Sequence, residues 1–178
     1  MLLNKEQSCV VLIDVQKKLT PLIRDPEILI NNCQSLLQLA NDMGVPHIIM
    51  EQYPEGLGST VKPLHNFSNA LPKVHFSCWR DPGFKELLPI MKKTQILLSG
   101  IETHVCVLQT ALDLIAANYQ VFVVVNAISS RNLIDHKYGL KRMQQAGVNL
   151  ITLEMVFFEW LRQAGTLEFK LLSQKFFK

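Results

Sequence analysis

The stretch ILLSGIETHVCVLQTALDLI, residues 96–115, decides the fold class. It begins as a continuous apolar run, is interrupted at Ser99-Gly100, and resumes as an almost wholly apolar segment. Short runs that are apolar at every position are typical of strands buried on both faces of a parallel sheet. The stretch therefore predicts a buried strand, a short loop, and a helix over about residues 104–118.

Similar apolar runs alternate with helix-period segments along the rest of the chain. Strands are predicted at 8–13, 46–50, 95–99, 121–125 and 148–152, with a shorter one at 70–74. Further helices are predicted from Asp25-Pro26-Glu27 to Gly44, over about 83–91 and over about 134–146, followed by C-terminal helices. This alternation predicts an α/β fold: a single domain, residues 1–178, forming a three-layer α/β/α sandwich around a six-stranded, mostly parallel Rossmann-like sheet.

Composition and charge narrow the function classes. The 178 residues are 48% hydrophobic and 19% charged, which is typical of a folded globular protein. The net charge of +3 comes from scattered Lys and Arg, so we expect no nucleic-acid partner. No apolar run approaches the roughly 18 residues of a membrane span, and no signal-peptide pattern opens the chain. The four cysteines form no CxxC pair, so we expect a cytoplasmic protein without disulfides, zinc ribbon or membrane partner.

Three chemically capable residues lie where predicted strands end. Asp14 directly follows the first strand, Lys73 lies in LPKVHFSCW, and Cys106 lies near the start of the third helix. Ligands of parallel α/β sheets bind outside the carboxyl ends of the strands. Each residue also has a structural interpretation: Asp14 as a turn cap, Lys73 as a surface lysine, and Cys106 as a small buried hydrophobe.

Together the three residues indicate nucleophilic catalysis. A helix start lowers the pKa of a thiol, so we expect Cys106 to be a thiolate that Lys73 stabilises. Asp14 is expected to shuttle protons, and backbone N–H groups at the helix start to bind an oxyanion. Cys9 and Cys33 are expected in the core, whereas Cys78 stays ambiguous.

The segments VVLIDVQ, LPKVHFS and GIETHVCVLQTALDL resemble the isochorismatase-like cysteine hydrolase family, particularly its isochorismatase domain-containing subgroup. EQYPEGLGSTV, NAISSR and RMQQAGVNLIT resemble that subgroup too, so that the likeness runs from about residue 8 to 152 in the family order. The resemblance implies a triad of Asp14, Lys73 and Cys106. It also implies a cis peptide between Ile101 and Glu102, an oxyanion hole formed by the amides of Glu102 and Cys106, and a homo-oligomer.

Two departures from the family pattern bear on the site. Nicotinamidases of this family bind a metal through Asp-x-His-x-x-His after the second strand, but this chain has Glu51-Gln52-Tyr53-Pro54 there, and His65 and His75 are isolated. We therefore expect no metal and no other cofactor. Asn126 stands where relatives commonly carry Asp, and we expect it to order the loop at residues 129–131.

Five residues near the strand ends are candidate pocket walls, although each aromatic among them could instead be a packing residue: Gln16, Leu19, Tyr53, Phe76 and Trp79. We expect His104 to face solvent, and the roles of the Glu102 and Asn126 side chains stay open. The amphipathic segment at 165–178 could pack on its own domain or cover a neighbouring subunit.

The leading hypothesis is a metal-independent cysteine hydrolase that acts on a small-molecule amide or related carbonyl compound through a thioester-type intermediate. Two alternatives stay open. One is hydrolysis of an isochorismate-like vinyl ether, which need not use the thiol. The other is a non-catalytic ligand-binding or scaffold protein.

Overall fold

The computed structural model describes residues 1–67 and 69–177 and contains one six-stranded parallel sheet. Its strands are β1 (Ser8–Ile13), β2 (His47–Gln52), β3 (Ala70–Lys73), β4 (Gln95–Ile101), β5 (Gln120–Ser129) and β6 (Asn149–Ile151). They follow the order β3-β2-β1-β4-β5-β6, the classical doubly wound order. The predicted α/β fold with a Rossmann-like sheet is confirmed, including the short strand at residues 70–73.

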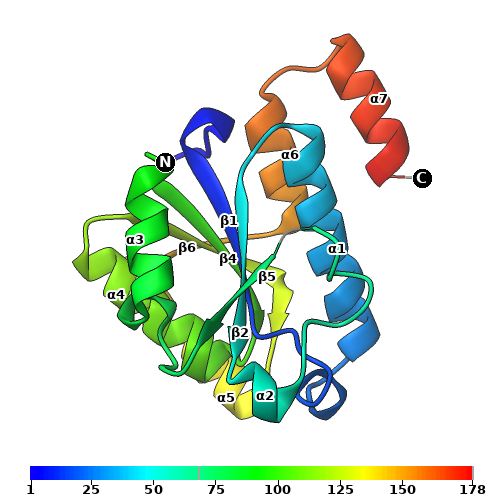
Figure 1. Ribbon diagram of the computed structural model, residues 1–178. Helices are drawn as coiled ribbons and strands as arrows, with labels where there is room; N and C mark the ends of the chain where they lie inside the picture. Colours follow the sequence, from blue (N-terminus) through cyan, green and yellow to red (C-terminus); the bar gives the residue numbers. More distant parts are fainter. Residues whose placement is uncertain (68, 178) are drawn as a thin grey trace.

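Helices cover both faces of the sheet (Figure 1). One face is covered by α1 (Pro26–Asp42) and α6 (Leu153–Leu161), and the other by α3 (Pro82–Ile90), α4 (Leu108–Ala116) and α5 (Leu133–Gln145). The last helix, α7 (Leu167–Phe176), packs on α6. The short α2 (Pro54–Leu57) follows β2. Alternate residues of β1 explain the two layers, because Val10 and Leu12 join one apolar core while Val11 and Ile13 join the other.

Two element boundaries differ from the sequence-based expectation in ways that matter for the site. β2 continues to Gln52 because β3 pairs with its last residues and gives these polar positions backbone partners. The helix after β4 does not begin as an α-helix at residue 104. Residues 103–107 form a π-helical turn in which the N–H of Val107 donates to the carbonyl of Glu102, and α4 starts only at Leu108.

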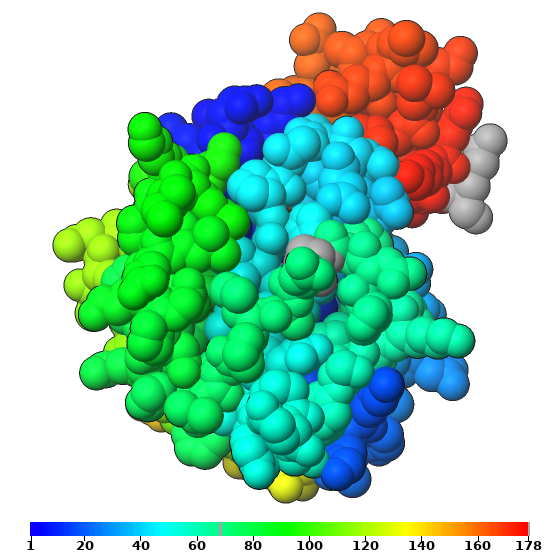
Figure 2. Space-filling model, viewed as in Figure 1, coloured from blue at the N-terminus to red at the C-terminus, as the bar shows by residue number. Residues whose placement is uncertain are grey.

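The C-terminal part extends beyond the sheet, and α7 forms a separate lobe at one end of the molecule (Figure 2). Leu172 of α7 is buried in the same core cluster as Phe157 of α6, whereas Leu167 and Leu171 are largely exposed. The amphipathic segment therefore packs partly on its own chain. Within the described residues, no helix combines the length and the apolar character that a membrane crossing needs.

Candidate active site

The carboxyl ends of the central strands bring the candidate residues together. Asp14 follows β1 with a left-handed backbone (φ 58°), and its N–H donates to the carbonyl of Met50 at 3.0 Å. Asp tolerates this backbone region better than most residues. Lys73 is the last residue of β3, and both side chains are almost completely buried. The two groups therefore meet outside the strand ends, as expected for a parallel sheet.

The ammonium group of Lys73 is fixed by four oxygens. Its Nζ lies 2.9 Å from Oδ2 of Asp14 and donates to Oε1 of Gln52 at 2.6 Å. It also donates to the carbonyls of His75 and Phe76, each at 3.2 Å. A buried ammonium group has lost its hydration, so its three N–H donors need acceptors from the protein, which these oxygens provide. Lys73 is thus held as a cation behind Asp14. Their contact is an ion pair, and neither carboxylate oxygen of Asp14 accepts a hydrogen bond among the described residues.

Cys106 lies in the π-helical turn after β4 and is 7% exposed. Gly100 lets the end of β4 pass close to β1: its φ is +117°, and a Cβ there would lie 2.1 Å from the carbonyl oxygen of Ile13. Gly139 of α5 similarly admits the turn, because a Cβ there would lie 3.1 Å from Cα of His104. π-turns are rare and often occur at functional sites. This backbone path places the Cys106 thiol above the strand ends.

Burial and mutual charge shift the pKa values of Asp14, Lys73 and Cys106. Burial raises the pKa of Cys106, the negative charge of Asp14 raises it further, and Lys73 opposes both effects. Burial also raises the pKa of Asp14, while Lys73 acts to lower it. Burial acts to lower the pKa of Lys73, but the charge of Asp14 outweighs it, so that this pKa is raised. Burial and the charge of Asp14 thus favour the neutral thiol and Lys73 favours the thiolate, so that the thiolate form of Cys106 stays a prediction.

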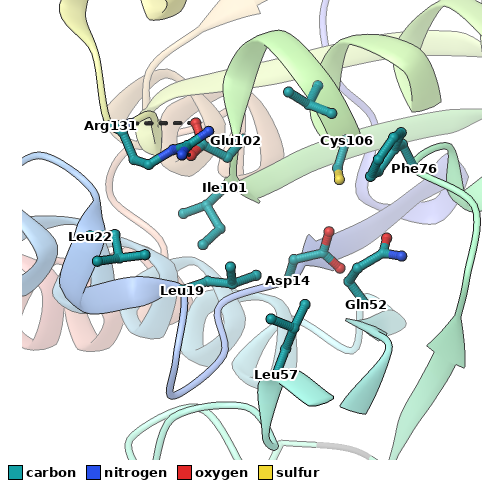
Figure 3. A pocket seen from close by; sticks show the side chains of 11 residues that line it. Asp14, Leu19, Leu22, Gln52, Leu57, Phe76, Ile101, Glu102, Cys106 and Arg131 are labelled. Atoms are coloured by element: carbon teal, nitrogen blue, oxygen red, sulfur yellow. Dashed lines mark hydrogen bonds and ion pairs between the residues drawn. The ribbon is translucent and has the colours of Figure 1, made fainter. Parts of the chain in front are cut away.

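A cavity of about 320 Å³ opens onto the thiol and the carboxylate (Figure 3). Its walls are mainly apolar, with a few polar groups, as is usual for small-molecule sites. The lining residues are Asp14, Leu19, Leu22, Gln52, Leu57, Phe76, Ile101, Glu102, Val105, Cys106 and Arg131.

Two of the five predicted wall residues line this cavity and three do not. Leu19 and Phe76 line it as expected. Gln16 is instead buried, donating to the carbonyls of Gln52 and Gly58 and accepting from the N–H of Gln52. Tyr53 is 55% exposed beside α2 and lies outside the cavity wall.

Trp79 also lies outside the cavity wall. Its ring packs edge-to-face on Phe84 and Tyr119, with ring centroids 6.5 and 5.5 Å away. These aromatic neighbours hold it away from the thiol, so the packing interpretation applies to Trp79.

Several site residues were not predicted. Gln52 lines the cavity and binds Lys73, and the polar end of β2 was the available signal for it. The side-chain role of Glu102 had stayed open: it forms an ion pair with Arg131 at 2.6 Å in the cavity wall, and its Oε2 lies 3.5 Å from Nδ1 of His104. His104 is half-buried rather than solvent-facing, and its Nδ1 also lies 3.3 Å from Oγ of Ser130. Arg131 and Ser130 come from a segment 26 to 29 residues after Glu102 and His104, and no local pattern links the two segments.

The expected cis peptide between Ile101 and Glu102 is absent, because the described residues contain no cis peptide bond. A trans bond is favoured by roughly 2.5–4 kcal/mol at a non-proline residue, and the positive φ of Gly100 already supplies a bend before the turn. The oxyanion role of the Glu102 and Cys106 amides therefore stays a prediction.

Asn126 does not order the loop at residues 129–131. Its Oδ1 accepts from the N–H of Leu153, and its carbonyl accepts from the side chain of Asn32. The loop is instead held by Ser130, whose Oγ accepts from the N–H of Thr103 at 3.0 Å, and by the Glu102–Arg131 pair. Asn126 thus binds α1 and the start of α6 rather than residues 129–131.

The remaining cysteines are buried and free. Burial raises the pKa of Cys9, Cys33 and Cys78 to about 12 in each case. Among the residues the structure describes, no three His, Cys, Asp or Glu side chains gather as a metal site would require.

Comparison with known proteins places this geometry in context. A family model described as the isochorismatase domain matches residues 8–155. Isochorismatase domain-containing protein 2A of Mus musculus is 38% identical over 167 residues, covering 93% of this chain and 80% of that protein. Isochorismatase domain-containing protein 1 of Danio rerio is 34% identical over 168 residues, covering 88% of this chain. The chain spans only 56% of that relative's length.

Solved structures share the fold over nearly the whole chain. The MAR1 ribonuclease from Caenorhabditis elegans has a TM-score of 0.92 at 32% identity, covering 100% of this chain and 93% of that one. YcaC of Escherichia coli, described as an octameric hydrolase of unknown specificity, has a TM-score of 0.91 at 28% identity, covering 97% and 89%. YcaC of Pseudomonas aeruginosa, solved with hexane-2,5-diol and covalent acrylamide, has a TM-score of 0.89 at 25% identity, covering 97% and 90%.

Proposed function

This chain belongs to the isochorismatase family, and we propose that it is a cysteine hydrolase that acts on a small amide or related carbonyl compound through Cys106. One observation carries the proposal. The Cys106 thiol and the Asp14 carboxylate line the same small cavity, and a buried lysine is fixed directly behind that carboxylate. A nucleophile, a base and a group that fixes the base are the parts that nucleophilic catalysis requires.

In the first half-reaction, Asp14 takes the proton of the Cys106 thiol while Sγ attacks the substrate carbonyl carbon. Burial raises the pKa of the Asp14 carboxyl, which makes it a stronger base than an exposed aspartate. The tetrahedral intermediate then collapses to a thioester, and the leaving amine takes the proton back from Asp14. Lys73 keeps Asp14 ionised before attack and oriented throughout.

In the second half-reaction, Asp14 takes a proton from a water molecule that attacks the thioester. Collapse of the second intermediate releases the acid, and the departing sulfur recovers the proton from Asp14. The amides of Glu102 and Cys106 are the oxyanion donors in this scheme, because Glu102 directly precedes the turn that carries the nucleophile and Cys106 lies within it. The covalent acrylamide in the P. aeruginosa neighbour supports a cavity in which a reactive amide can form a bond.

We also propose that the protein forms a homo-oligomer. The octameric description of the E. coli neighbour supports this, as do the exposed apolar side chains of α7. Sedimentation velocity of the purified chain tests the assembly separately from the chemistry.

The test of the enzymatic proposal is turnover of a panel of small primary amides, read as ammonia release. We expect Cys106→Ala to abolish turnover and Cys33→Ala, a buried cysteine on the other face of the sheet, to retain it. Undiminished turnover in Cys106→Ala overturns the thiol mechanism. Including isochorismate in the panel tests the vinyl-ether alternative, which predicts turnover that survives loss of the thiol.

A further inference from the structure

The cavity wall contains an ion pair that the chemistry above does not use. Nε of Arg131 lies 2.6 Å from Oε1 of Glu102, and the backbone N–H of Arg131 donates to Oε2 at 3.3 Å. Both side chains line the cavity, and Figure 3 shows them on the side away from Gln52. The positive charge of Arg131 is therefore already compensated where a substrate binds.

The remaining charges of the cavity disfavour an anionic ligand. Asp14 and Glu102 present carboxylates to the cavity, whereas Lys73 lies behind Asp14 and does not belong to its lining. Among the lining residues, Arg131 is the one cation, and Glu102 pairs with it. A substrate carboxylate would thus meet two like charges, and the one cation of the wall is already engaged through its Nε with Glu102.

The other walls disfavour a charge of either sign. Leu19, Leu57, Phe76, Ile101 and Val105 surround the reactive groups, and a charged group placed against them loses its hydration without compensation. A volume of about 320 Å³ lies at the lower end of the roughly 300–1,000 Å³ usual for ligand sites, so the bound group is small.

We infer that the substrate carries a small, uncharged, apolar side group next to the reacting carbonyl, and that Glu102 determines this specificity by neutralising Arg131. The class is that of neutral aliphatic amides and their carbonyl analogues. This inference rests on the proposed function, because it takes Cys106 as the reacting atom of the cavity.

Two matched alkylating probes test it on the full chain without requiring turnover. N-isobutyl-2-chloroacetamide and chloroacetylglycine differ chiefly in that a branched apolar end replaces a carboxylate of similar shape. Labelling rates at Cys106, read by peptide mass spectrometry, are divided by the rates with the free thiol N-acetylcysteinamide. The ratio of the two normalised rates, isobutyl probe over glycine probe, should be at least about ten. Each methylene added along an N-alkyl series should raise the rate about fourfold, the equivalent of about 0.8 kcal/mol, until the cavity is full.

Two variants change the ratio in opposite directions if Glu102 acts as inferred. Glu102→Gln frees the charge of Arg131 and should lower the ratio about tenfold, because a charge-assisted contact to the probe carboxylate becomes available. Arg131→Gln leaves Glu102 unpaired and should raise it. Arg80→Gln removes an arginine that is 65% exposed and pairs with Asp113 away from the cavity, so the ratio should not change.

The outcomes separate this inference from the proposed function. Equal normalised rates for the two probes in the wild-type chain overturn the specificity even if amides are hydrolysed. A ratio that Glu102→Gln and Arg131→Gln both leave unchanged overturns the role of Glu102. Failure of both probes to label Cys106 overturns the inference as a whole. A preserved ratio without any amide turnover supports the specificity and counts against the hydrolase.

Discussion

The buried ion pair between Asp14 and Lys73 gives the sharpest prediction of stability. The N···O distance is 2.9 Å and both side chains are almost wholly excluded from solvent. At an effective dielectric constant of about 20, two unit charges at that distance attract by about 6 kcal/mol. Removing one member of such a pair typically costs about 3–5 kcal/mol, because the other charge stays buried without compensation.

We therefore expect Lys73→Met and Asp14→Asn each to lower the free energy of unfolding by about 3–5 kcal/mol at neutral pH. The double variant buries no unpaired charge and should be more stable than either single variant. The double-mutant cycle formed by the wild-type chain, the two single variants and the double variant should give a coupling energy of about 3 kcal/mol or more. Urea unfolding followed by circular dichroism measures all four proteins. The exposed Arg80–Asp113 pair is the control, with an expected coupling of at most about 1 kcal/mol.

The pH dependence of Lys73→Met has a definite sign. The pKa of Asp14 is already raised by burial, and loss of Lys73 removes an effect that lowers it. The folded state then binds the proton more tightly than the unfolded state, so stability falls as the pH rises from the unfolded to the folded pKa. Lys73→Met should therefore regain stability on mild acidification. Additive single variants, or a loss that is independent of pH, would refute the reasoning.

Asp14→Asn should lower the pKa of Cys106 and Lys73→Met should raise it, because the first removes a negative neighbour and the second a positive one. Thiolate absorbance at 240 nm, with Cys106→Ser as the blank, measures both shifts, and unchanged or reversed shifts would contradict the charges assigned to the site. The acidic limb of the activity profile should lie above the ordinary range of an aspartate, because the base must be ionised and its pKa is raised; a limb at or below that range counts against Asp14 as the base. Gly100→Ala should lower the free energy of unfolding by more than about 3 kcal/mol, because its Cβ would lie 2.1 Å from the carbonyl oxygen of Ile13 at a φ of +117°. Gly83→Ala in α3, where a Cβ would meet nothing within 4 Å, is the control and should change it by less than about 1 kcal/mol. Urea unfolding measures both, and similar values would contradict the close approach of β4 and β1.

The sheet was predictable because its strands are buried on both faces. The central strands β1 and β4 are buried at every residue, and most of their residues are apolar, which gives continuous apolar runs in the sequence. The end of β2 was missed because Glu51 and Gln52 are polar, and their strand conformation depends on pairing with β3. The π-turn at residues 103–107 likewise depends on α5, which approaches the turn through Gly139.

The positions of the three candidate residues could be predicted from the sequence better than the walls of the cavity. Asp14, Lys73 and Cys106 lie at or just beyond strand ends, and the topology alone brings such positions together. The walls depend on the conformation of loops. Gln16 and Leu19 are three residues apart, yet Gln16 is held by hydrogen bonds to the backbone whereas Leu19 lines the cavity. The state of the thiol depends on burial, which sequence position could not provide.

The central claim is that Cys106 forms a covalent acyl intermediate which Asp14 helps to hydrolyse. Peptide mass spectrometry of acid-quenched protein after mixing with 4-nitrophenyl acetate, an activated carbonyl probe, tests it directly. We predict an acetyl group on Cys106 that is transient in the wild-type chain and in Cys33→Ala. The adduct should be absent in Cys106→Ala and should last at least about 100-fold longer in Asp14→Asn, which lacks the base. Release of nitrophenol at an undiminished rate by Cys106→Ala, or an adduct whose lifetime Asp14→Asn does not change, would contradict the account.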